Sequence, residues 1–145
     1  MKKINFIILL SISLGISAKD LISLNEYISE NDLKDLFVVE YISKRCSASN
    51  LAVSRFIGEG NEGYDTAFNG YLAWFLTAQD LRSKKRPDQD PEVAMENVAS
   101  SIVNMTNVIE EIMQDSQDIR GSIFEGNSII NDLTICKEMV NSVNN

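Results

Sequence analysis

Apolar residues recur at steps of three and four along most of this chain, which is the spacing that places side chains on one face of an α-helix. Four segments carry such a stripe: 33–57, 64–86, 91–120 and 122–143. Strict alternation of apolar and polar residues, which would indicate strands, does not compete with this pattern. The hydrophobic pattern therefore predicts an all-α protein with about four main helices.

Local signals support the ends of these helices. Asp90 and Pro91 have the residue types of an N-cap and of a first helical position, and Pro87 stops the helix before them. Three glycines within residues 58–63 predict a loop. Short connections between antiparallel neighbours favour an up-and-down bundle.

Two further sequence features add to the predicted helical architecture. The spacing from Ser23 to Glu26 is that of a capping box, and it predicts a short leading helix that ends near Ser29. The segment 64–86 is apolar around most of its circumference, so we expect it to form the central helix of the bundle.

The first 18 residues have the pattern of a secretory signal peptide. Lys2 and Lys3 precede a short apolar run over residues 4–16, and Ala18 is the small residue expected before a cleavage site. The run is too short for a comfortable membrane span, although an uncleaved anchor is the alternative. We expect residues 19–145 to form a single helical domain that is periplasmic or secreted, without stable membrane insertion after cleavage.

Cys46 and Cys136 are the two cysteines of the chain. Each lies on the apolar stripe of its helix, so both are expected in the core where the two helices meet. An exported protein favours a disulfide between them, and the alternative is two buried free thiols. The spacing lacks a Cys-x-x-Cys motif, which favours a structural role over a redox one.

Charge and composition exclude several function classes. The chain has 13 basic and 21 acidic residues, and removal of Lys2 and Lys3 leaves 11 basic residues and a net charge of −10. Such a surface disfavours binding of nucleic acid. The chain contains no histidine, so serine–histidine triads and imidazole metal sites are excluded. We expect no catalytic residues, no metal and no cofactor.

The acidic loop is the one place where enzyme chemistry stays open. Glu59-Gly60 followed by Tyr64-Asp65-Thr66 resembles the catalytic loop of phage-type lysozymes. The spacing between the two acids is shorter than in that family, and a helix is expected where the family has a strand. A loop of solvated acids is the alternative.

Two further groups are candidate binding residues. The single basic cluster of the chain is a candidate interaction surface, although cations also favour the carboxyl end of a helix; it consists of Arg82, Lys84, Lys85 and Arg86. Aromatic residues of the same segment are a candidate pocket, although aromatic stripes are usually core; they are Tyr64, Tyr71 and Trp74.

These observations favour a small exported interaction protein without enzymatic activity, of the inhibitor, immunity, adaptor or envelope-stress type. The expected partner is another protein, because a surface of one sign suits electrostatic steering. The alternatives are a small cell-wall hydrolase that uses carboxylates and a carrier of a small apolar ligand. An exposed apolar patch beside charged residues would favour the first reading, and a cavity of a few hundred cubic ångströms would favour a carrier.

Overall fold

The computed structural model describes residues 21–143 of the chain, with side chains up to residue 140. The expected signal peptide lies outside these residues. The described part of the chain forms five helices and no strand: α1 Leu24–Glu30, α2 Leu36–Ile57, α3 Tyr64–Lys85, α4 Pro91–Arg120 and α5 Ile129–Val143. The predicted all-α class is confirmed, and α1 is the short leading helix.

The helix ends follow the chemistry of the sequence. The Asp90 carboxylate accepts hydrogen bonds from the backbone N–H groups of Glu92 and Val93, which would otherwise lack partners at the start of α4. Gly121 ends α4 in the left-handed region, with a φ of 76°. The loop predicted within residues 58–63 connects α2 to α3, as the sequence indicates.

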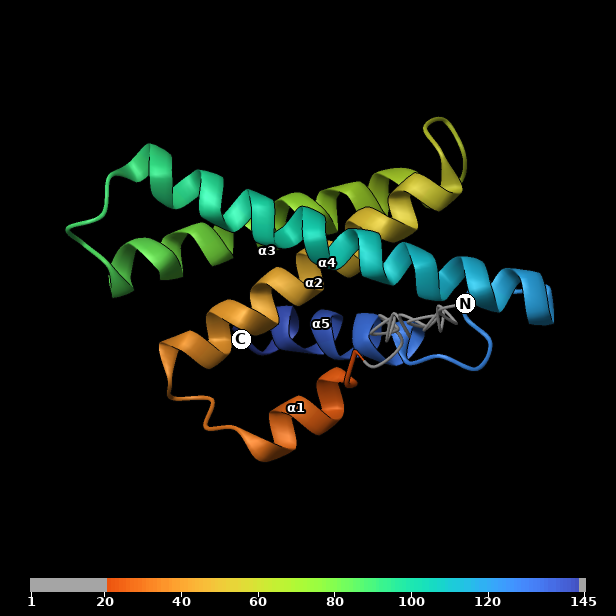
Figure 1. Cartoon of the computed structure of the whole chain (residues 1–145), viewed down its shortest axis with the longest axis horizontal. Coiled ribbons are helices and arrows are strands. Elements are labelled where there is room, and N and C mark those ends of the chain that lie inside the picture. Colours follow the sequence, from red (N-terminus) through yellow and green to blue (C-terminus); the bar gives the residue numbers. More distant parts are fainter. Residues whose placement is uncertain (1–20, 144–145) are drawn as a thin grey trace, which may run out of the picture.

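α2 crosses the middle of the molecule, with α3 and α4 on one side of it and α5 and α1 on the other (Figure 1). α2 packs against α3, α4 and α5, whereas α1 packs against α5. The central helix is therefore α2, and the expectation that α3 would be central is wrong. Thirteen residues of α2 are buried, against three of α3: Ala67, Trp74 and Ala78.

Small side chains allow α2 to take the central position. Gly70 of α3 lies so close to α2 that an added Cβ would stand 2.5 Å from the Asn50 Oδ1 atom. Nearby, the buried Ser47 hydroxyl donates a hydrogen bond of 3.0 Å to the Tyr71 carbonyl oxygen. The contact between α2 and α3 thus has little room for larger residues at Gly70 and Ser47, so the fit of the two helices matters more here than the number of apolar side chains.

The buried apolar residues form two clusters. The larger one joins α2, α3 and α4 and includes Ile102 and Ile109. The smaller one contains the disulfide between Cys46 of α2 and Cys136 of α5, whose Cα atoms lie 5.7 Å apart. The predicted disulfide is confirmed, and it fastens α5 to the central helix.

None of the helices within residues 21–143 has the length and apolar character that a membrane span requires.

Candidate functional site

A buried carboxylate organises the basic residues at the junction of α2 and α3. Glu40 has 2% of its side chain exposed. Its oxygens lie 2.9 Å from Lys44 Nζ and 3.7 Å from Arg82 Nη1, and the Lys85 ammonium group forms a close ion pair with it. Burial alone would raise the pKa of Glu40, but hydrogen bonds from Lys85 and Lys44 outweigh this effect and lower the pKa. Three cations therefore surround one ionised carboxylate.

This arrangement divides the predicted basic cluster. Arg82 and Lys85 turn toward Glu40, and the Lys85 side chain is nearly buried. Lys84 is exposed and pairs with Asp80 at 2.6 Å, one turn earlier on the same helix. Arg86, the residue that ends α3, is exposed. The cluster thus stabilises the α2–α3 junction and also leaves positive charge at the surface.

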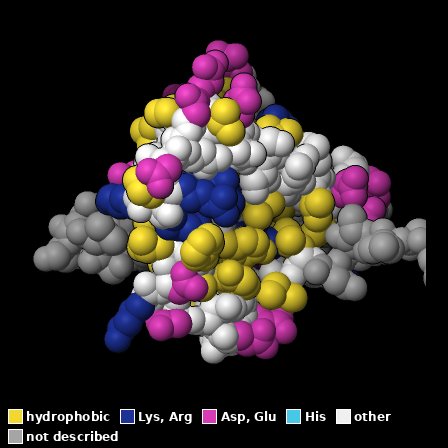
Figure 2. Space-filling model, turned by 60° about the vertical axis from the view of Figure 1, so that its left-hand side comes forward, with side chains coloured by type: hydrophobic (Ala, Val, Ile, Leu, Met, Phe, Trp, Pro, Cys, Tyr) yellow, Lys and Arg dark blue, Asp and Glu magenta, His cyan; other side chains and the backbone are white. Residues whose placement is uncertain are grey.

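Apolar side chains lie beside these cations. The Lys85 Nζ atom stands 3.4 Å from the centre of the Phe37 ring, and 59% of Phe37 is exposed. Leu33 and Leu36, just before it in the chain, are also exposed. Figure 2 shows basic side chains gathered on one face, bordered by an apolar area, with acidic groups toward the edges. We call this surface the Phe37 face; it consists of the exposed Leu33, Leu36, Phe37 and Arg86, the partly exposed Lys44 and Arg82, and the nearly buried Lys85 in contact with Phe37.

A groove lies between α3 and α5, with α2 as its floor, and has a volume of about 510 Å³. Val53 lines the floor, Trp74 lines the α3 wall, and Leu133 and Val140 line the α5 wall. The disulfide half Cys136 also faces the groove. We call this feature the α3–α5 groove.

The predicted aromatic pocket is divided by the structure. Trp74 lines the α3–α5 groove, whereas Tyr64 and Tyr71 are not among its lining residues. Tyr64 stacks on Phe68 with ring centres 5.7 Å apart, and the contacts continue through Tyr71 to Phe75. Tyr71 packs against the larger apolar cluster. The tyrosines therefore belong to a ladder of aromatic rings along α3.

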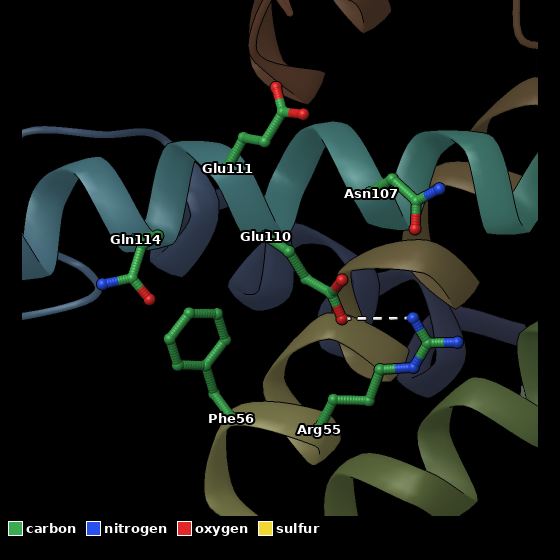
Figure 3. Close-up of a pocket in the computed structure, with 6 residues that line it drawn as sticks. All are labelled: Arg55, Phe56, Asn107, Glu110, Glu111 and Gln114. Atoms are coloured by element: carbon green, nitrogen blue, oxygen red, sulfur yellow. Dashed lines mark hydrogen bonds and ion pairs between the residues drawn. The ribbon is translucent and has the colours of Figure 1, made fainter.

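A second hollow lies between α2 and α4, with a volume of about 710 Å³ (Figure 3). Arg55 and Glu110 point toward each other across it, with Nη1 and Oε1 3.2 Å apart. The neighbouring Glu111 points away from Glu110, as consecutive residues of a helix must. The two carboxylates therefore do not flank a common position, and the hollow lacks the geometry of a paired-carboxylate site.

The acidic loop that resembles a lysozyme loop is open to solvent. Glu59, Glu62 and Asp65 are exposed, and none of them lines the hollows described above. Asp65 lies in the first turn of α3, where a negative charge favours the helix dipole. Within residues 21–143, no group of three or more cysteine, aspartate and glutamate side chains could hold a metal ion.

Sequence reasoning missed a buried ion pair beside the disulfide. Arg45 Nη2 lies 2.7 Å from Asp132 Oδ2, and both side chains are almost completely buried. The second Asp132 oxygen accepts the backbone N–H of Leu24 at 2.9 Å, which ties α1 to α5. Asp132 stands four residues before Cys136, so the helical periodicity that placed Cys136 in the core also placed Asp132 there.

Comparisons with known proteins identify no relative of this chain. No family model matches the chain, and no curated protein and no solved structure has a significant similarity to it.

Proposed function

We propose that this chain is an exported helical protein that binds a partner protein through the Phe37 face. The observation that carries the proposal is the exposed Phe37 ring in contact with the Lys85 ammonium group, on a chain whose net charge is −8. Figure 2 shows basic side chains bordered by an apolar area on one face of the molecule. Exposed apolar area rimmed by charge is typical of protein-binding surfaces. Aromatic residues and arginine are also the residue types enriched at binding hot spots.

Charge complementarity defines the chemistry of the partner. Lys44, Arg82 and Lys85 share the single carboxylate of Glu40, so this cluster keeps a net positive charge. The exposed Arg86 adds one more positive charge. A partner surface that presents carboxylates beside apolar residues fits this arrangement. Repulsion between the remaining acidic surface and such a partner would orient the encounter toward the Phe37 face.

Two features support export. The amino-terminal sequence has the pattern of a signal peptide, and the Cys46–Cys136 disulfide is of the kind that persists in oxidising compartments. Both features support the proposed periplasmic or secreted location.

Affinity capture from envelope extract of the source organism tests the proposal. The bait is the chain expressed with residues 1–18 and recovered from the periplasm. The critical variant is Phe37→Ser/Arg86→Glu, which removes the exposed ring and reverses one charge. We expect wild type to retain one stoichiometric partner at low salt, and the variant to bind it about tenfold more weakly or worse.

A matched control makes the same kind of change elsewhere. Ile119→Ser/Arg120→Glu also removes an exposed apolar side chain and reverses one arginine, at the end of α4. This variant should retain the partner as wild type does. Absence of any partner, or equal retention by both variants, would contradict the proposed role of the Phe37 face.

A further inference from the structure

The α3–α5 groove shares no residue with the Phe37 face, and its composition differs from that of the protein as a whole. The chain carries 21 acidic residues. Among the described residues that line the groove, none is acidic and Lys137 alone is basic. The lining of the groove thus combines an apolar surface with the positive charge of Lys137 and contains no carboxylate.

The walls of the groove suit an apolar chain. Val53, Trp74, Leu133 and Val140 present apolar surface from three helices, and Val140 is partly exposed at the groove. The polar groups are few: Asn50, Thr66 and the Lys137 ammonium group. Small-molecule sites commonly combine mostly apolar walls with a few polar groups, and their volumes range from about 300 to 1,000 Å³. The volume of about 510 Å³ falls within this range.

We propose that the α3–α5 groove binds a single-chain amphiphile with an anionic head group. The hydrocarbon chain would lie against Trp74, Leu133 and Val140, and the head group would pair with Lys137. The absence of carboxylates from the described lining favours an anionic over a cationic head group. A carboxylate and a phosphate satisfy the same requirement, so a fatty acid and a phosphate-bearing lipid fragment share this chemistry.

Trp74 supplies a direct readout, because it is the single tryptophan of the chain and lines the groove. The test titrates the protein recovered from the periplasm with four probes that share a ten-carbon chain: decanoate, decyl phosphate, decanol and decyltrimethylammonium. All are kept at concentrations where they remain monomeric. We expect saturable changes in Trp74 fluorescence, with the anionic probes binding about two- to fivefold more tightly than decanol.

Three variants separate head-group recognition from contact with the chain. Lys137→Gln should reduce the affinity for the anionic probes to that for decanol. Val140→Ser should weaken binding of all four probes, because it removes apolar surface at the groove. Lys84→Gln changes an exposed lysine outside the groove and should leave every affinity unchanged.

The same titrations distinguish the two classes of anionic ligand. A stronger response to decyl phosphate than to decanoate would identify the phosphate-bearing class, and the reverse order would identify fatty acids. Absence of saturable binding, or affinities for the anionic probes that Lys137→Gln leaves unchanged, would overturn the proposal. The proposal would also be overturned if Trp74 fluorescence responded to an amphipathic peptide but to none of the four probes, because the groove would then be a peptide site.

Discussion

α2 and α3 are both 22 residues long, but they occupy opposite environments. α2 contains the buried serines 43, 47, 49 and 54 and two buried charged residues, yet most of it lies inside the protein. α3 is rich in aromatic and aliphatic side chains, yet Leu72 and Leu76 are exposed, the latter to 61%. The comparison shows that the central helix of this protein is the one with small side chains on several faces, although it buries more polar groups than α3 does.

The partners of the polar groups on α2 are specific. The hydroxyls of Ser43 and Ser54 donate to carbonyl oxygens of α2 itself, and Ser47 donates to α3. Glu40 and Arg45 are paired with opposite charges. Among the described residues, the buried Ser49 hydroxyl and the Nε and Nη1 atoms of Arg45 have no hydrogen-bond partner. Burial of polar groups is tolerated when hydrogen bonds or ion pairs replace their contacts with water. The following experiments test whether the central position of α2 depends on these particular contacts.

Removal of the disulfide should have the largest effect, because it fastens α5 to α2. Cys46→Ala/Cys136→Ala frees a loop with a sequence separation of 90 residues. In the chain-entropy model such a loop contributes about 4–5 kcal/mol to the free energy of unfolding, which is an upper figure. Urea denaturation of the variant and of wild type measures the difference. An unchanged unfolding midpoint would show that the bond contributes no stability.

Disruption of the buried ion pair should come next. Asp132→Ala leaves the buried Arg45 guanidinium without its partner, and we expect a loss of about 3–5 kcal/mol in unfolding free energy. Arg45→Met/Asp132→Leu should recover much of this loss, because it removes both charges. Glu110→Ala breaks the partly exposed pair with Arg55 and should cost below about 1 kcal/mol. Similar losses for Asp132→Ala and Glu110→Ala would contradict the importance of burial.

A pair of single substitutions tests the comparison directly. Ser47→Leu makes α2 more hydrophobic but overfills its contact with α3, so it should destabilise the protein by about 1–3 kcal/mol. Leu76→Ser makes α3 less hydrophobic at an exposed position and should change stability by at most about 0.5 kcal/mol. Both are measured by urea denaturation. The opposite order would show that hydrophobicity decides which helix is central.

The ion pairs of Glu40 should make the stability depend on pH, and this dependence is the last effect to test. The folded-state pKa of Glu40 is lowered from its ordinary value of 4.5, so its charge stabilises the folded protein above that value. This contribution should decline as the pH falls below about 4.5 and through the lowered pKa. The difference in unfolding free energy between wild type and Glu40→Gln, measured from pH 7 to pH 3, should shrink in this range. A difference independent of pH would exclude the expected role of the Glu40 charge.

Much of the fold followed from periodicity and local signals. The Asp90 cap and the core positions of Cys46 and Cys136 were predicted from residue type and spacing. The central position of α2 could not be predicted in this way, because helix packing at Gly70 depends on the fit of two surfaces.

The candidate sites were predicted less completely, for related reasons. The basic cluster was recognised as a group, but its division around Glu40 requires knowing that α2 and α3 meet there. The α3–α5 groove combines residues from three helices, and only Trp74 among the predicted aromatic residues lines it. Helical periodicity assigns a side chain to a face of its own helix, but it does not identify the residues of other helices across from that face.

The contacts of Asp132 have a consequence for the order in which the protein can fold. Leu24 and Arg45 both bind Asp132, which lies 108 residues after Leu24 and 87 residues after Arg45. A chain that is synthesised or threaded through a pore from its amino end cannot complete these contacts until α5 has emerged. Until then, Arg45 and Cys46 lack the partners that they have in the folded protein. The contacts that join α1 and α2 to α5 therefore form late, and their large sequence separation is of the kind that slows folding.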